Sequence, residues 1–379
     1  MGDTVESFLE TVRGFAMEEV APGAALWERE RRMGTEALQT AAQMGLTGLQ
    51  VPVELGGLGH PFSVKSAVGE ALAGADFGFA MSVLNTQNVA HRLTRDADPR
   101  LSQAYLADLL AGRRVGCTAL TEPHAGSDFA AITTRAERDG DGWVLTGEKA
   151  WIINAAIADL VVVYAQTDPA KGGAGIASFL IDAQRAGFER RPPFGMSAQN
   201  TIGAGGFRLT GYRAEAHEMI RPAGEAFKSA LTDINGARIY VAAMCCGMVA
   251  RALEIAAAYG RERSTFGSAL TGHQGWRWRL AEAECDLAAA QLMVKDAAAL
   301  IDAEGDARFA AARTKIFATR MAERHLSALA QSMGAEGLRE EYPFGRHMIG
   351  ARVASFTDGS TEMLLERLSG QYSKPPRTS

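Results

Sequence analysis

The chain has 379 residues, a length that allows two or three domains of about 150 residues each. Apolar residues make up 47% of it and charged residues 22%, which is typical of a folded globular protein and excludes a disordered one. The 39 Lys and Arg residues against 44 Asp and Glu residues give a net charge of −5, so we expect no nucleic-acid partner.

The first part of the chain carries a helical pattern. From Val5 to about Leu110, apolar residues recur at intervals of three and four, the spacing that one face of a helix requires. A helix is expected over residues 35–49, before the Gly-Gly-Leu-Gly turn of residues 56–59. We therefore predict a helical N-terminal domain over residues 1–112.

Short β-rich segments follow. Residues 142–147, 160–164 and 176–181 have the composition of strands, which predicts a central β-domain over residues 113–222. The glycine-rich run Gly203–Gly206 matches neither a dinucleotide-binding nor a phosphate-loop motif, so we expect it to be a loop.

Helices return after about residue 230. Between residues 277 and 304 large apolar residues lie seven apart, each of the first three followed after three residues by an alanine, which predicts a helix packed in an antiparallel bundle. A second long helix is expected over residues 308–333. We predict a helical bundle domain over residues 223–379. The order of helices, strands and helices is that of an α+β chain, mainly α, and argues against a nucleotide-binding Rossmann domain.

The cysteines and histidines indicate neither a disulfide framework nor a metal site. Cys117, Cys245, Cys246 and Cys285 have no paired spacing, and the seven histidines form no zinc-binding motif. A GxSxG hydrolase motif is also absent from the sequence. With no export signal and no uninterrupted apolar run of about 18 residues, we expect a cytoplasmic protein that does not span a membrane.

Two motifs carry a family resemblance. Residues 118–128 read Thr-Ala-Leu-Thr-Glu-Pro-His-Ala-Gly-Ser-Asp, and residues 147–154 read Gly-Glu-Lys-Ala-Trp-Ile-Ile-Asn. This pair resembles the signature of the acyl-CoA dehydrogenase family, in which the two runs frame a flavin. Further matches lie at residues 44–49, 56–59, 263–267, 273–274, 331–337 and 356–362.

The resemblance implies a helical domain, a central β-barrel-like domain and a C-terminal four-helix bundle, the order that periodicity also predicts. It further implies an FAD enzyme that oxidises an acyl-CoA thioester and passes electrons to an electron-transfer flavoprotein. Such enzymes are often homodimers or homotetramers, in which one subunit's bundle contributes to its neighbour's FAD site.

The difference from the family pattern that matters most for the mechanism lies at the residue that would act as the catalytic base. Oxidation of a thioester to its 2,3-enoyl form requires a base beside the carbonyl while hydride leaves the next carbon for the flavin. Relatives carry a Glu where this chain has Asp358, one methylene shorter, which is our candidate base. Other relatives place the base before an Arg matching Arg238, but Ala237 stands there. A structural alternative remains, in which Asp358 has no catalytic role and only favours a turn before Gly359.

The resemblance also implies the residues around this base. The backbone N–H of Asp358 and a ribityl hydroxyl of FAD would stabilise the thioester oxygen, and desolvation would raise the pKa of Asp358. Ile153 replaces the usual Thr beside the flavin. The implied substrate-binding residues are Ser127, Asn235, Arg238 and Gly359. The implied FAD-binding residues are Leu120, Thr121, Trp151, Ile153, Arg263, Phe266, Gln274, Gln331, Gly334, Ala335, Ser360 and Glu362.

Three functions remain open at this point. The first is an acyl-CoA dehydrogenase. The second is a flavoprotein oxidase that resembles nitroalkane oxidase, in which an Asp is also the base. The third is a subunit of a mixed oligomer that binds FAD but has weak chemistry because its base is shortened.

Overall fold

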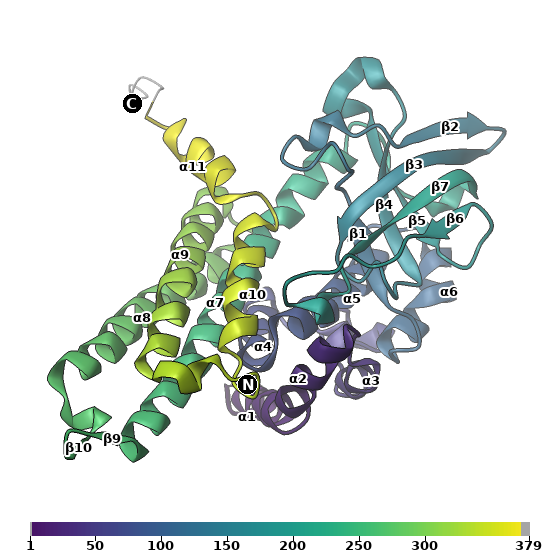
Figure 1. The fold of residues 1–379 in the computed structure, drawn as a ribbon. Coiled ribbons are helices and arrows are strands. Elements are labelled where there is room, and N and C mark those ends of the chain that lie inside the picture. Colours follow the sequence, from purple (N-terminus) through teal and green to yellow (C-terminus); the bar gives the residue numbers. More distant parts are fainter. Residues whose placement is uncertain (1, 373–379) are drawn as a thin grey trace.

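The computed structural model describes residues 2–372 (Figure 1). The strands form one domain at the right of Figure 1, the early helices lie below it, and long helices form a bundle at the left. The order of helices, sheet and helices confirms the α+β, mainly α architecture. The predicted domain limits fall between elements, since a helix ends at Leu110, the sheet spans 116–221 and the next helix begins at Ala226.

Within the described residues, the first part of the chain contains six α-helices: α1 (Gly2–Phe15), α2 (Ala21–Glu30), α3 (Thr35–Gln43), α4 (Phe62–Ala75), α5 (Phe77–Arg95) and α6 (Pro99–Leu110). The expected helix over 35–49 is shorter, because Gly45 adopts a φ of 80° that an α-helix does not allow. Helix α5 is buried over most of its length, and Asp76 caps its start by accepting a hydrogen bond from the Phe79 N–H. It therefore forms a fixed support for the elements around it.

The middle of the chain forms an eight-stranded sheet in which the order is β6-β7-β3-β2-β4-β5-β8, with β1 parallel to β4. Its strands are β1 (Gly116–Ala119), β2 (Arg135–Asp139), β3 (Gly142–Ile152), β4 (Leu160–Gln166), β5 (Ile176–Asp182), β6 (Phe188–Arg190), β7 (Gly205–Ala214) and β8 (Met219–Arg221). The three predicted strands are confirmed as β3, β4 and β5. Both β4 and β5 are buried throughout, so they form the centre of this domain.

The expectation of a loop at Gly203–Gly206 is wrong for its second half. Gly205 and Gly206 begin β7, which pairs with the end of β3. A Cβ at Gly206 would lie 2.4 Å from the Lys149 carbonyl oxygen, so only glycine permits this close approach. The glycines therefore serve strand packing next to the second motif.

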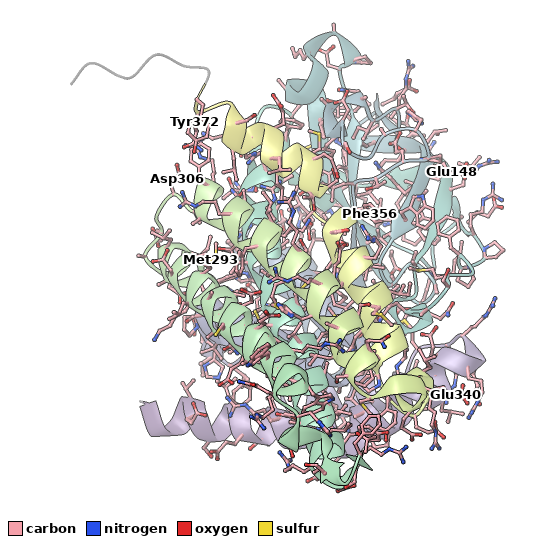
Figure 2. The ribbon with its side chains drawn as sticks, turned by 60° about the vertical axis from the view of Figure 1, so that its left-hand side comes forward. Glu148, Met293, Asp306, Glu340, Phe356 and Tyr372 are labelled. Carbon is pink, nitrogen blue, oxygen red and sulfur yellow. The ribbon has the colours of Figure 1, made fainter. Side chains whose placement is uncertain are left out.

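The C-terminal part consists of α7 (Ala226–Glu262), the short hairpin β9 (Ser264–Thr265) and β10 (Ser268–Ala269), α8 (Gln274–Asp302), α9 (Arg308–Ser332), α10 (Phe344–Phe356) and α11 (Thr361–Ser369). The predicted helices over 277–304 and 308–333 are confirmed as α8 and α9. The alanines at 283, 290 and 297 are fully buried, as a packed seam requires. Figure 2 shows α8, α9 and α10 side by side, with Phe356 at the end of α10 and Glu340 in the segment that precedes its start.

Helix α7 is the central helix of the bundle. By length and composition alone it could cross a membrane, but a helix at the core of a globular protein passes the same test. Its residues from Ile239 to Val249 are all buried, and it packs on α4, α8 and α9. Side chains of α1, α4, α5, α7, α8, α9 and α10 share one hydrophobic core, so the first helices and the bundle pack as one unit.

Candidate active site

A buried ion pair joins the two sequence motifs. Lys149 of β3 lies 2.9 Å from the Glu122 carboxylate, and its ammonium also donates to the Leu120 carbonyl oxygen at 2.9 Å. Glu122 further accepts backbone hydrogen bonds from Thr133 and Thr134. Burial would raise the pKa of Glu122, but Lys149 and these donors lower it to about 2. The pair therefore fixes the loop after β1 against β3.

The end of β3 presents an unusual aromatic side chain. Trp151 has a left-handed φ of 59° and is 61% exposed, although tryptophan normally buries its ring. One side of the indole contacts Phe194, with ring centroids 4.4 Å apart. The backbone N–H groups of Thr121 and Ile153 donate to no residue within the described part of the chain. An open aromatic face thus lies close to free backbone donors.

Asn154 follows the end of β3 and anchors this segment to the first domain. The side chain is fully buried, and its amide donates to the carbonyl oxygens of Ser82 in α5 and Gly116 in β1, each at 3.0 Å. Since α5 is itself buried, the end of β3 is held against the first domain. Glu122, Lys149 and Asn154 were not predicted as site residues, although all three lie inside the quoted motifs.

Asp358 lies in the connection between α10 and α11, within a tight turn. Its φ is 57° and that of Gly359 is 97°, so both residues are left-handed. Asp tolerates this conformation better than most residues, and glycine adopts it without strain. Asp358 thus forms the turn before Gly359 that the sequence analysis considered as an alternative to a catalytic role. A role of Asp358 as base is compatible with this turn.

Arg238 of α7 holds this turn through the backbone. Its Nε donates to the Asp358 carbonyl oxygen at 2.9 Å, and its Nη1 donates to Asn235 Oδ1 at 2.8 Å. Both Arg238 and Asn235 are buried, at 5% and 6% exposed. The structure therefore places these two predicted substrate-binding residues behind the turn, together with Gly359, which lies next to the Arg238 guanidinium. Ser127, by contrast, is exposed in the loop after β1.

The Asp358 carboxylate is left free. It accepts no hydrogen bond from any residue between 2 and 372, and the backbone N–H of Asp358 also donates to none. Burial raises the pKa of this carboxyl, while Lys315 and Arg238 act in the opposite direction. The predicted direction of the shift is confirmed, and a carboxylate with a raised pKa and no partner is suited to accept a proton.

The predicted FAD-binding residues fall into two groups. Leu120, Thr121, Trp151 and Ile153 lie at the end of β3 and the loop after β1, while Ser360 and Glu362 follow Asp358. The Ser360 hydroxyl caps α11 by accepting a hydrogen bond from Met363, and Glu362 is exposed. The remaining six lie at the other end of the bundle: Arg263, Phe266, Gln274, Gln331, Gly334 and Ala335.

This second group is a single exposed patch. Trp276 Nε1 donates to the Ser332 carbonyl oxygen at 2.9 Å and so ties the start of α8 to the end of α9. Phe266 is fully exposed at the β9–β10 turn. At 1.5 Å per residue along α7, about 37 Å separates Arg238, which holds the Asp358 turn, from Arg263. The second group therefore lies far along the bundle from that turn.

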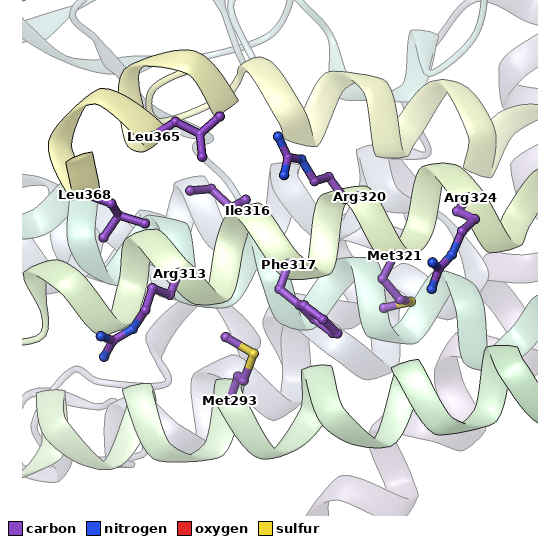
Figure 3. A pocket seen from close by; sticks show the side chains of 9 residues that line it. All are labelled: Met293, Arg313, Ile316, Phe317, Arg320, Met321, Arg324, Leu365 and Leu368. Atoms are coloured by element: carbon purple, nitrogen blue, oxygen red, sulfur yellow. The ribbon is translucent and has the colours of Figure 1, made fainter.

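A groove of about 480 Å³ lies apart from these residues (Figure 3). It runs along α9 between α8 and α11, and its lining includes Phe317, Arg320 and Leu365. At 100° per residue, Phe317 and Arg320 lie on the side of α9 away from Lys315, which faces the Asp358 turn. The groove is therefore not part of the candidate active site.

Three family models match almost the whole chain. They are the N-terminal, middle and C-terminal domains of acyl-CoA dehydrogenase, over residues 2–113, 117–210 and 224–372. The chain belongs to the acyl-CoA dehydrogenase family. It is thus an enzyme of a family of FAD flavoproteins, and the resemblance of its motifs is confirmed.

Individual acyl-CoA dehydrogenases match over nearly their full lengths. The mitochondrial short-chain specific enzyme of Bos taurus is 31% identical, over 99% of this chain and 92% of that protein. The short-chain specific enzyme of Clostridium acetobutylicum is 31% identical, over 96% of each. Among solved structures, butyryl-CoA dehydrogenase from Megasphaera elsdenii has a TM-score of 0.94 at 27% identity, covering 99% of both chains.

The residues of this acyl-CoA dehydrogenase family member fit FAD at the end of β3. The half-open Trp151 indole offers a flat face to a flavin ring, and the free N–H groups of Thr121 and Ile153 offer donors to its polar edge. Ile153 lacks the hydroxyl of the usual Thr, so only its backbone can donate there. FAD, when bound, would supply the acceptor for hydride.

Proposed function

We propose that this enzyme catalyses the 2,3-dehydrogenation of an acyl-CoA thioester, with Asp358 as the base that removes the α-proton. The observation that supports this most is the free, partly buried carboxylate of Asp358, whose pKa is raised by burial and whose backbone is fixed by Arg238. An unpaired carboxylate that is held in place meets the two demands on a general base, which are geometry and proton affinity.

The backbone of the same residue has a second role in this proposal. The free N–H of Asp358 donates to the thioester oxygen and stabilises the negative charge that develops when the proton leaves. Arg238 serves this donor as well, because it fixes the peptide of Asp358 through the carbonyl oxygen. Base and donor then lie on one rigid turn, so the shorter side chain of Asp does not displace the donor.

We further propose that FAD binds between two subunits of a homodimer or homotetramer. Leu120, Thr121, Trp151 and Ile153 hold the ring end, together with Ser360 and Glu362. The exposed patch of Arg263, Phe266, Gln274, Gln331, Gly334 and Ala335 serves the neighbour's flavin, since it lies far along the bundle from the Asp358 turn of its own chain. A guanidinium such as Arg263 suits the diphosphate of the cofactor.

The natural electron acceptor in this proposal is an electron-transfer flavoprotein, and the enzyme acts in the cytoplasm without a membrane or nucleic-acid partner. The relatives named above are short-chain and butyryl-CoA enzymes, which supports a short acyl chain as the substrate. Chain length is tested with a panel of straight, branched and cyclic thioesters.

One observation favours a second candidate. A base that is Asp in place of Glu is also expected of an oxidase that resembles nitroalkane oxidase. Anaerobic mixing separates the two reactions. Flavin bleaching by an acyl-CoA supports the dehydrogenase, and peroxide release with a nitroalkane supports the oxidase. A yellow protein that is inert to both, in its purified homo-oligomer, would contradict both and leave a subunit of a mixed oligomer.

A further inference from the structure

A single lysine lies at the centre of the turn that carries the proposed base. Lys315 of α9 is 1% exposed, and its ammonium donates hydrogen bonds to the carbonyl oxygens of Ser355, Thr357 and Gly359. The distances to Ser355 and Gly359 are 3.4 and 2.6 Å. These three carbonyls flank Asp358 on both sides, so all three hydrogens of the ammonium are used to shape one short segment.

Part of this arrangement is ordinary helix capping. Helix α10 ends at Phe356, and the last carbonyls of a helix carry partial negative charge that a cation stabilises. Capping alone does not require a fully buried cation, because exposed helix ends bind water instead. Burial of this ammonium is unfavourable, and it lowers the pKa of Lys315 to about 8. The position of the charge therefore calls for a further reason.

The charges around Asp358 come from three helices. Lys315 of α9 and Arg238 of α7 are the two cations whose fields favour the ionised carboxylate. Arg367 of α11 acts electrostatically on Arg238, and Cys245 of α7 and Glu362 of α11 act on Lys315. The buried hydroxyl of Tyr240 in α7 lies within the field of Asp358. Neither cation donates to the carboxylate itself, since both bind backbone carbonyls.

We propose that Lys315 is the positioning residue of the base: it holds the Asp358–Gly359 turn through its neighbours' carbonyls and places a positive charge beside the carboxylate without occupying it. This inference rests on the proposed function, in which Asp358 is the base. An ammonium suits the task because it points three hydrogens in different directions, whereas a guanidinium is a planar fork. The carboxylate stays free for the substrate proton.

The test compares Lys315→Met, Lys315→Gln and Lys315→Arg with the wild type and with Lys295→Met, an exposed lysine of α8 that serves as a matched control. The limiting rate of anaerobic flavin reduction by an acyl-CoA is measured against pH. Loss of one nearby opposite charge moves a carboxyl titration by about one pH unit or more. In the Met and Gln variants we expect the acidic limb of this rate profile to move to higher pH. Below the limb, the rate of flavin reduction should be roughly tenfold lower than in the wild type. The Arg variant should keep the limb but lose rate.

A second measurement needs no flavin turnover. In the apoprotein, difference infrared spectra of each protein against its own Asp358→Asn version report the protonated carboxyl of Asp358 alone. Its titration should move to higher pH in Lys315→Met and Lys315→Gln, and not in Lys295→Met. An unchanged titration, with flavin reduction slowed equally at every pH, would overturn the inference and leave a structural cap. If no acyl-CoA reduces the wild-type flavin, the proposed function fails while the infrared result still decides the role of Lys315.

Discussion

Lys149 and Glu122 form an ion pair in which the side chains are 0% and 1% exposed, with 2.9 Å between Nζ and Oε1. The pair connects the loop after β1 to β3, and the ends of these segments carry Leu120, Thr121 and Trp151. The pair therefore links the two sequence motifs directly. The proposed flavin contacts of these residues therefore depend on a buried ion pair that does not itself contact the flavin in this proposal.

Removal of one partner of this pair should be severely destabilising. Lys149→Met leaves the Glu122 carboxylate buried without its cation, which typically costs about 3–5 kcal/mol in the free energy of unfolding. The double variant with Glu122→Gln should recover part of that loss. Chemical unfolding of the purified proteins checks this, with the exposed Lys171→Met as control. Equal stability of Lys149→Met and wild type would show that the pair is dispensable.

Trp151→Ala should weaken FAD binding with little effect on folding. The ring is 61% exposed, so its removal leaves no cavity, whereas a flavin stacked on it would lose roughly 1 kcal/mol or more. We expect about a tenfold higher Kd for FAD from fluorescence titration of the apoprotein. Trp278, on α8, is 59% exposed, and Trp278→Ala is the matched control. If both variants bind FAD alike, Trp151 does not contact the flavin.

Asp358→Asn should stabilise the protein at neutral pH. Burial raises the pKa of Asp358 in the folded state, with Lys315 and Arg238 opposing, so ionisation of this carboxyl disfavours folding. The contribution of the protonated group is fully present below the unfolded pKa of about 3.9 and is lost as pH rises through the folded value. Asn also tolerates the left-handed φ.

Thermal unfolding across pH measures this effect. The Tm of Asp358→Asn should exceed that of the wild type at neutral pH, and the difference should shrink as pH falls through the raised pKa. The exposed Asp141→Asn is the control and should change nothing. A lower Tm for Asp358→Asn at neutral pH would mean that the two cations outweigh burial.

The two separated groups of FAD-binding residues predict complementation between subunits. Asp358→Asn and Arg263→Ala should each be inactive at limiting FAD. In a mixed oligomer, one site combines the intact Asp358 of the Arg263→Ala chain with the intact Arg263 of the other. Co-expression with two different tags and measurement of thioester-dependent flavin reduction should recover activity. If the mixed oligomers are no more active than either parent protein, Asp358 and Arg263 of neighbouring subunits do not complete one active site.

Much of the fold could be predicted because long periodic segments leave little choice. The alanine and leucine spacing of 277–304 specifies one buried face, and α8 matches it within a few residues. The ends of helices and the structure of glycine runs were harder to predict. Helix α3 ends at Gln43, because Gly45 has a left-handed φ. Gly205 belongs to a strand because it pairs with β3, a tertiary contact that overrides local composition.

The candidate site could be predicted only where a motif marks it. Asp358 and Trp151 lie in recognisable runs, whereas Lys315 is one lysine in a long amphipathic helix, a pattern that ordinarily means a solvated face. Its partner Gly359 is 44 residues further along the chain, so no local spacing connects them. The clustering of charges around Asp358 arises from the packing of α7, α9 and α11, which the sequence does not display.

The most direct measurement of the central claim is single-turnover reduction of the flavin by short acyl-CoA substrates, with protium or deuterium at the α-carbon, in the wild type and in Asp358→Asn. We predict a primary isotope effect in the wild type, and a rate about 10²–10⁴-fold lower in Asp358→Asn, the range that general-base catalysis contributes, at equal FAD content. Near wild-type reduction by Asp358→Asn, with the isotope effect intact, would show that another group removes the proton.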